Sequence, residues 1–320
     1  MKYIFSILFF FAIFHVNASG DNLYQKVLIT NAKLAHEASK SLIIALNKNN
    51  KIPKKEFKNL VIRWKKVEAI YILSSLDDKY IDTPWYLDMF HGKNENIKVQ
   101  LNRIIESEGN IVKALYKNSH KTINALEYVL YTHDLDNPRV KDIALLISKS
   151  MENRFLEILN GYIINENEFL KDKKIGSAFL LNSLVESSYK LKEWRVGDVA
   201  GITRKYKGKP DNTRSEYYLS GNSVEAIKAI LEAHKQIINS NQYEDFSDFA
   251  KNYNANKEIA LTIKWLNNSF QILSKIKNDN LTGDLAKEFY QSSTNLQNGY
   301  YSSLMNKLNF VAKILDADGD

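Results

Sequence analysis

The sequence predicts an all-α protein that is divided into two helical bundles. Through most of the 320 residues, apolar side chains recur at the i, i+3, i+4, i+7 spacing of an amphipathic helix. We find no segment that alternates convincingly between apolar and polar residues, as a half-buried strand would. Only 4 prolines and 12 glycines interrupt the chain, which favours long helices over many short strands.

The first eighteen residues are typical of a secretory signal peptide. Lys2 supplies a positive charge, residues 3–14 form an apolar run, and Ala18 precedes the expected cleavage point. The alternative is an uncleaved anchor, but the run is shorter than the roughly 20 residues that span a bilayer. We therefore expect an exported protein, periplasmic or secreted, that is soluble and has no transmembrane span once the signal peptide is removed. Because the chain contains no cysteine, its stability must come from burial rather than disulfide bonds.

Four apolar stripes predict the helices of an N-terminal bundle, which we assign to residues 19–165. One interpretation is that the third stripe continues past Gly109 into residues 121–131. Polar or proline-containing segments mark the breaks between helices. The stripes cover residues 23–46, 57–71, 97–105 and 143–159, and the breaks lie at 47–53, 77–84 and 133–138.

Four more stripes predict a C-terminal bundle, which we assign to residues 166–320. The polar segment 165–174 divides the chain after the signal peptide nearly in half, so we place the boundary between the bundles there. The stripes cover residues 179–191, 224–238, 259–273 and 296–314. A further break falls at residues 278–283.

The connection over residues 197–222 is long for a link between packed helices. Connections of this length are uncommon unless they are functional or disordered. Tyr206, Tyr217 and Tyr218 offer aromatic side chains that can dock on the helices. We therefore interpret the segment as a functional loop.

Residues 121–131 combine polar and apolar side chains in an unusual way. Asn124 and Glu127 are three residues apart within a helical stripe of apolar residues, so both side chains lie on the same side of a helix. An acid is almost never fully buried without a partner or a metal ion. The segment therefore predicts either a binding site or a buried hydrogen-bond network.

The formal net charge of +7 comes from lysines that are scattered along the chain. An arginine-rich stripe with interleaved aromatic residues, which is typical of nucleic-acid binding, does not occur. We therefore expect no nucleic-acid partner.

Four short segments follow one another in a characteristic order. They are Trp64 with Tyr71 on one predicted helix, residues 122–131, the stretch from Arg195 to Ser223 with its G-K-P-D and S-E-Y-Y-L-S-G-N-S runs, and the acidic ending 317–320. Together they resemble the imelysin-like family, which includes insulin-cleaving metallopeptidases and iron-regulated periplasmic proteins. The family motif G-x-H-x-x-E corresponds to Thr122, Asn124 and Glu127, so that only its glutamate is kept.

The resemblance implies two four-helix-type bundles packed together, with a cleft between them that holds the functional site. It also implies a link to iron or another divalent metal, for which Glu127 and Asn124 are the candidate ligands on the motif segment. A second group of candidate binding residues comes from the later segment: Arg195, Glu216, Ser220 and Ser223.

An asparagine in the histidine position changes the chemistry that the motif can support. An amide oxygen is a poor ligand for zinc, iron or copper, and a metallopeptidase normally needs about three protein ligands and an activated water. His120 lies four residues before Asn124 and seven before Glu127, so on a continuous helix it would share their face and could supply an imidazole. The alternative is a surface histidine near the start of the helix.

The second group also has two interpretations. Arg195 and Glu216 either contact a ligand or form a structural ion pair that clamps the long loop. Ser220 and Ser223 either contact a ligand or cap the helix that follows them.

From these observations we expect a non-catalytic binding component in iron or metal acquisition. Its partners would be a metal ion or metal complex, held in the cleft, and a membrane-associated component of iron uptake. The alternatives are a metal-dependent peptidase of the imelysin type and a structural or adaptor module with a degenerate site.

Overall fold

The protein is all-α, as its sequence predicts. The computed structural model describes residues 22–92 and 95–311, and within these ranges the regular elements are helices. An isolated bridge pairs Asn22 with Glu244. The signal peptide expected over residues 1–18 and the acidic ending 317–320 lie outside the described residues.

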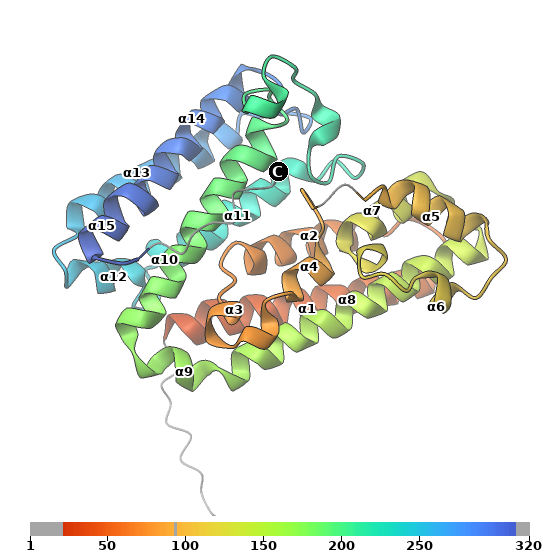
Figure 1. Cartoon of the computed structure of the whole chain (residues 1–320), viewed down its shortest axis with the longest axis horizontal. Helices are drawn as coiled ribbons and strands as arrows, with labels where there is room; N and C mark the ends of the chain where they lie inside the picture. The colour runs from red at the N-terminus through yellow and green to blue at the C-terminus, as the bar shows by residue number, and fades with distance from the viewer. Residues whose placement is uncertain (1–21, 93–94, 312–320) are drawn as a thin grey trace, which may run out of the picture.

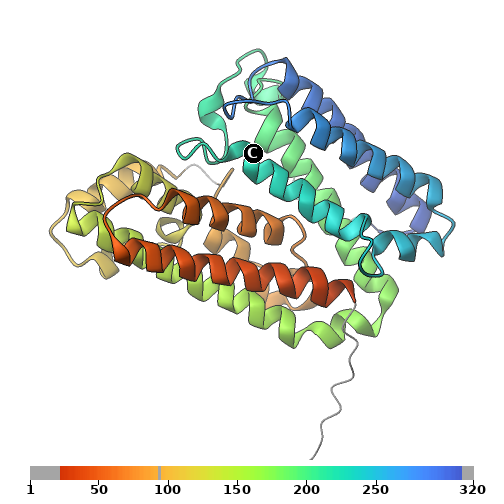
Figure 2. The ribbon, with the colours of Figure 1, turned by 180° about the vertical axis from the view of Figure 1, so that it is seen from behind.

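The first group of helices is built on α1 (Thr30–Lys48), which continues the π-helix η1 (Tyr24–Ile29). α1 packs along both α2 (Lys54–Glu68) and α8 (Pro138–Ile164), and α7 (Ile123–Thr132) lies against α8. Figures 1 and 2 show these long helices side by side in both views. Shorter elements complete the group: α3 (Leu73–Leu76), η2 (Asp78–Tyr80), α4 (Thr83–Leu87), α5 (Ile97–Glu106), α6 (Ile111–Ala114) and η3 (Ser119–Lys121).

The second group follows the short helix α9 (Glu166–Lys171). α10 (Lys173–Lys190) runs into the π-helix η4 (Leu191–Gly197), and both pack against α14 (Asp284–Asn298), which also lies along α13 (Asn256–Leu273). α14 continues as the π-helix η7 (Gly299–Leu304) and α15 (Met305–Leu308). The remaining elements are η5 (Arg204–Tyr206), η6 (Asn212–Arg214), α11 (Ser223–Ile238) and α12 (Phe246–Lys251).

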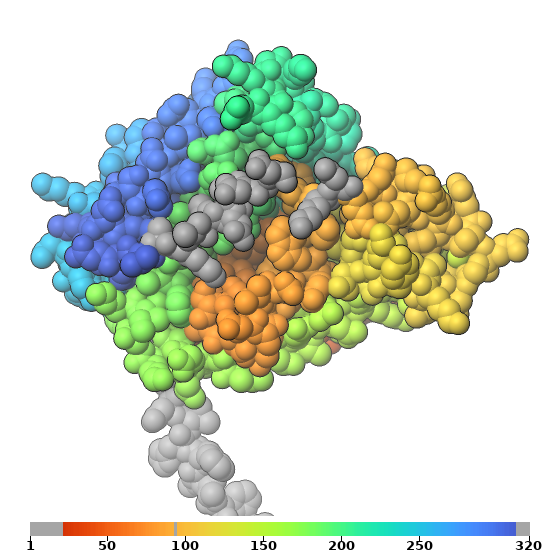
Figure 3. All heavy atoms as spheres, in the orientation of Figure 1, coloured from red at the N-terminus to blue at the C-terminus, as the bar shows by residue number. Residues whose placement is uncertain are grey.

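The two groups meet where α11 packs against α2. In Figure 3 the second group, green to blue, lies along the first group, whose visible part is orange to yellow-green. The buried apolar residues of both groups form one continuous cluster. The predicted boundary between residues 19–165 and 166–320 falls at the junction of α8 and α9. The division of the chain into two separate bundles at this point stays a prediction. None of the described helices combines the length and the apolar character that a membrane span requires.

Local sequence signals explain where several helices begin. Thr122, Asn137 and Asp172 place a side-chain oxygen on backbone N–H groups at the starts of α7, α8 and α10. Pro138 follows directly at the first position of α8, where the missing N–H costs no hydrogen bond. The interpretation of one helix from residue 97 through 131 is wrong, because α5, α6, η3 and α7 are separate elements.

Candidate functional site

The motif helix α7 does not include His120. The hydroxyl of Thr122 accepts a hydrogen bond from the Ala125 N–H, so α7 begins at Ile123 and His120 lies in the preceding 3-10 turn η3. His120 is buried, and its Nε2 lies 2.7 Å from Oε1 of Gln100 on α5. Burial lowers the pKa of His120. The expectation that His120 shares one helix face with Asn124 and Glu127 is therefore wrong, since the cap ends the helix before it.

Asn124 uses its amide oxygen to hold the chain that follows α4. Its Oδ1 accepts a hydrogen bond of 2.7 Å from the backbone N–H of Met89. The oxygen that a metal ion would need is therefore already bonded to the backbone.

Glu127 connects α7 to the 197–222 segment. Its Oε1 accepts hydrogen bonds from the backbone N–H of Ser220 at 2.8 Å and from the Ser220 hydroxyl at 2.6 Å. Burial raises the pKa of this carboxyl, and the bonds from Ser220 oppose the rise. Glu127 thus belongs to a buried hydrogen-bond network between residues that are 93 positions apart.

A cluster of buried charges lies beside this network, at the contact between the two groups of helices. The ammonium of Lys65, on α2, donates to Glu68 Oε2 at 2.7 Å, Asp88 Oδ2 at 2.7 Å and Glu216 Oε1 at 2.5 Å. Lys65 is 0% exposed. We call Lys65, Glu68, Asp88, Arg195 and Glu216 the junction cluster.

The π-helix η4 brings the second cation of the junction cluster. Arg195 Nε donates to Glu216 Oε2 at 2.7 Å, and its Nη2 donates to both oxygens of Glu68 at 2.9 and 3.1 Å. The guanidinium carbon lies 5.8 Å from the ring centre of Phe90. Insertions of this kind into α-helices are frequent at functional sites because they redirect side chains.

Neutral donors complete the shell around Asp88. Trp64 Nε1 and the Tyr217 hydroxyl donate to its Oδ2 at 2.9 and 3.1 Å, and the Phe90 N–H donates to its Oδ1 at 2.9 Å. Asp88 thus receives hydrogen bonds from α2, from its own loop and from residues 197–222, which we call the long segment. Fully satisfied networks of this kind define a single geometry for the elements that they join.

The electrostatics of the junction cluster follow from burial and close pairing. Burial opposes the charge on Lys65, but Asp88, Glu216 and Glu68 outweigh it and raise the pKa of the ammonium. Burial likewise opposes the charge on Asp88, but Lys65 keeps the pKa of that carboxyl well below its usual range. With three carboxylates against two cations, burial raises the pKa of Glu216 to about 7 despite Arg195 and Lys65.

The three carboxylates of the junction cluster have the spacing of a metal site but do not fit a divalent ion. One oxygen from each of Glu68, Asp88 and Glu216 lies within 4.8 Å of the others. Lys65 already donates to all three acids, so a divalent ion would meet the ammonium at the same place. The motif helix does not fit well either, because Glu127 Oε1 and Asn124 Oδ1 already accept hydrogen bonds and His120 Nε2 is bonded to Gln100 on α5.

The second group of candidate residues is only partly brought together. Arg195 and Glu216 are paired in the junction cluster, and Ser220 contacts Glu127 instead. Ser223 is the first residue of α11, and the Asp279 carboxylate accepts hydrogen bonds from the N–H groups of Ser223 and Val224 at 2.6 and 2.9 Å. The start of α11 is therefore capped by a residue that lies far along the chain.

Sequence reasoning missed Lys65, Glu68 and Asp88 as site residues. Lys65 follows Trp64 within the apolar stripe of α2, and Glu68 lies one turn later on the same helix. A lysine in such a stripe is a signal of a buried, paired charge. Asp88 carries no comparable signal, because its side-chain partners are 23 or more positions away.

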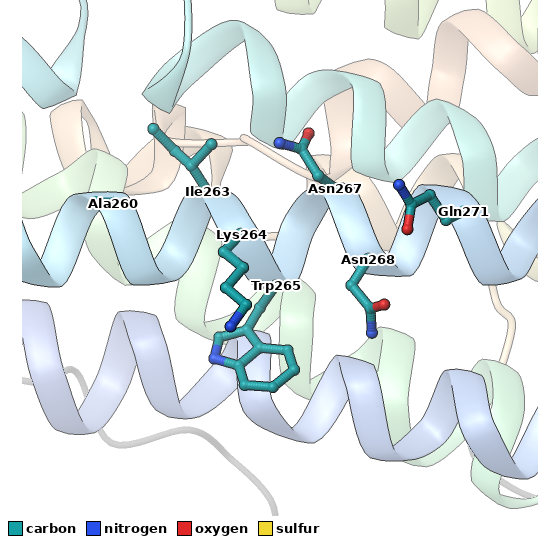
Figure 4. A pocket seen from close by; sticks show the side chains of 7 residues that line it. All are labelled: Ala260, Ile263, Lys264, Trp265, Asn267, Asn268 and Gln271. Carbon is teal, nitrogen blue, oxygen red and sulfur yellow. The ribbon is translucent and has the colours of Figure 1, made fainter.

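Two pockets accompany these elements. One of about 440 Å³ lies at the junction of α2 and α11, and the other, of about 450 Å³, is on α13. In Figure 4, Asn268 points from α13 toward the neighbouring helix, and its amide donates to Ser292 on α14 at 2.9 Å. The junction pocket is lined by Lys58, Gly221, Val224, Glu225, Ile276, Asn278 and Asp279, and the α13 pocket by Ala260, Ile263, Lys264, Trp265, Asn267, Asn268 and Gln271.

Comparison with known proteins identifies the family. The family model of the imelysins matches residues 22–298, so the chain belongs to the imelysin family. No curated protein matches the chain.

Two solved structures share the fold. An imelysin-like protein from Psychrobacter arcticum 273-4 is 17% identical with a TM-score of 0.71, and the match covers 91% of this chain and 94% of that one. A protein described as an iron-regulated protein A precursor, from Parabacteroides distasonis ATCC 8503, is 13% identical with a TM-score of 0.62, covering 89% and 90%.

Proposed function

We propose that this imelysin-family protein is an exported, non-catalytic binding component of metal acquisition, which holds a metal complex in the pocket between α2 and α11. Family membership and the shared fold with an iron-regulated precursor support the link to iron and to export. The pocket supports the binding role, because it lies between the two groups of helices and beside the segment that carries Glu216 and Ser220.

The observation that carries the proposal is the bonding of Asn124 and Glu127. A catalytic metal needs about three protein ligands and one open position for water. Here the Asn124 oxygen accepts the Met89 N–H and Glu127 Oε1 accepts two bonds from Ser220. Asn124 thus holds the chain after α4 and Glu127 holds the segment 197–222, and these structural roles favour binding over hydrolysis.

The rim of the junction pocket favours a charged, polar ligand over a bare ion. Lys58 Nζ and Glu225 Oε1 form a partly exposed pair at 2.8 Å, so each can exchange its partner for a ligand group at little cost. A metal complex that carries carboxylate groups would meet the ammonium of Lys58 at this rim. Glu225 could accept from the hydroxyl groups of such a complex.

Calorimetric titration of residues 19–320 with ferric citrate, and separately with Fe²⁺ and Zn²⁺, tests the proposal. We expect one ferric citrate per chain, with affinity lowered at least tenfold in Lys58→Ala and unchanged in Lys264→Ala, which alters the α13 pocket instead. Equal affinity in both variants would place the complex elsewhere. Hydrolysis of an unfolded polypeptide by the purified protein with added Zn²⁺ or Fe²⁺ would contradict the non-catalytic role and favour a peptidase.

A further inference from the structure

We infer that the ammonium of Lys65 stands in the place of a divalent cation, and that removing it opens a metal site between the two groups of helices. The inference is independent of the proposed function, since it concerns the junction cluster and not the pocket. Because the ammonium of Lys65 fills this position, the contact between α2 and the long segment in the wild-type protein does not depend on a metal ion.

The geometry around Lys65 is that of a coordinated cation. An ammonium has three N–H donors, and here each of the three acids offers an oxygen at 2.5 to 2.7 Å from Nζ. Oxygen ligands of Ca²⁺ lie at about 2.3 to 2.6 Å, so a centre of this size accepts such an ion with small adjustments. The acids come from α2, from the chain after α4 and from the long segment, as the ligands of an ion that joins separate elements would.

The surroundings keep the ammonium in this position. Lys65 is fully buried, and the ring centre of Tyr217 lies 5.3 Å from its Nζ. If the ammonium left, three buried carboxylates would face Arg195 alone. Removing one partner from a buried charge network is strongly unfavourable, so wild-type protein retains Lys65 against a competing ion.

Charge balance predicts the effect of shortening Lys65. Three carboxylates and two cations give the junction cluster a formal charge of −1, and loss of the lysine changes it to −2. The shortened side chain also leaves space where Nζ was. A divalent cation then restores neutrality and finds oxygens from Glu68, Asp88 and Glu216.

The test compares Lys65→Ala with wild type in the full chain after signal cleavage, purified with a chelator. We expect Lys65→Ala to bind one Mn²⁺ or Ca²⁺ and, at about 100 times the dissociation constant, to gain roughly 5 °C in unfolding midpoint. Wild type and Lys66→Ala should gain nothing. Lys66 is the matched control because it pairs with Glu232 at 2.6 Å, outside the junction cluster.

Two results would overturn the inference. The first is stoichiometric binding by wild type that disappears in Glu216→Gln, since the metal and the ammonium would then coexist. The second is a folded Lys65→Ala protein that binds neither ion.

A variant with the formal charge of wild type decides the matter if Lys65→Ala does not fold. Lys65→Ala combined with Glu68→Gln leaves two acids and Arg195, so the formal charge of the junction cluster stays at −1, as in wild type. Binding of Mn²⁺ by this double variant, with none by wild type, supports the inference. Absence of binding by the folded double variant overturns it.

Discussion

Two buried bases, Lys65 at the junction and His234 within the second group of helices, show opposite ways of accommodating a titratable group. Both side chains are 0% exposed. Lys65 is surrounded by three carboxylates and stays charged, whereas the hydrogen-bond partners of His234 are hydroxyl groups: Ser187 Oγ lies 2.9 Å from its Nε2 and the Tyr300 oxygen 3.2 Å from its Nδ1. Burial lowers the pKa of His234 to about 3, so it stays neutral.

The difference shows that the partners decide the charge state when burial is equal. At the junction, the charged groups fix how the elements are placed relative to one another, because each hydrogen bond holds a separate element. Inside the second group, the neutral imidazole adds packing and two hydrogen bonds without requiring a counter-ion. We therefore expect the junction to be sensitive to single charge changes and the region of His234 to be sensitive to pH.

The largest effect is expected from Lys65→Met. Methionine keeps much of the side-chain length but leaves three buried carboxylates with Arg195 as their one cationic partner. Breaking a buried pair of this kind costs about 3 to 5 kcal/mol of unfolding free energy. Urea unfolding followed by circular dichroism measures the loss, and a loss below about 1 kcal/mol would show that the cluster contributes little.

The second effect is a pH dependence that originates at His234. Between pH 6.5 and about 3 the unfolded state binds a proton at this residue and the folded state does not, so its contribution to stability falls as pH falls. From pH 7 to pH 5 we expect a loss of about 2 kcal/mol in wild type relative to His234→Gln. The measurement is urea unfolding of both proteins at the two pH values.

The comparison with His234→Gln is needed because Glu216 acts in the opposite direction. Its pKa is raised to about 7, so the stability that it contributes is complete below its unfolded pKa and is lost as pH rises through 7. Glu216 is present in both proteins, so its effect cancels in their difference. Equal pH slopes for the two proteins would mean that His234 is protonated in the folded state.

The helices could be predicted well because their signal is local. The stripes over residues 143–159, 224–238 and 259–273 lie within α8, α11 and α13, since the 3.6-residue period of buried side chains is written in neighbouring positions. The stripe over 296–314, whose last three residues lie outside the described ones, located the start of the final helix less well. Most of α14 precedes it, and this helix has polar residues such as Gln291, Ser292 and Ser293 on its face.

The junction could not be predicted in the same way because its contacts are long-range. Lys65 meets Glu216 from a distance of 151 positions, and Glu127 meets Ser220 from 93. The resemblance to the imelysins led to Arg195 and Glu216, but it did not indicate that Lys65 lies between the acids. The packing of α11 on α2 joins the two groups of helices at this place.

The third effect is expected from Glu127→Gln. Glutamine keeps the size of the side chain and one oxygen for the Ser220 N–H, but it removes the charge that strengthens both hydrogen bonds. A hydrogen bond to a charged group contributes about 1.5 to 3 kcal/mol and a neutral one about 0.5 to 1.5, so the weaker bonds cost about 1 kcal/mol. Relief of a buried charge, which the raised pKa of Glu127 reflects, reduces this loss. Ser220→Ala is the matched variant, and the double variant should cost less than the sum of the two single changes. Strict additivity in urea unfolding would show that the two side chains act separately.

The smallest effect is expected from Lys66→Ala, one residue after the lysine whose loss should matter most. Lys66 and Glu232 form a pair at 2.6 Å between α2 and α11, but their side chains are 14% and 35% exposed. Water and salt screen such a pair, so its removal should cost about 0 to 1 kcal/mol. Raising NaCl from about 0.05 to about 0.5 M should abolish this difference while leaving the effect of Lys65→Met almost unchanged, because screening does not reach a fully buried cluster. Equal salt sensitivity of the two variants in urea unfolding would mean that solvent enters the junction, and that Lys65 stabilises the contact as a surface charge would.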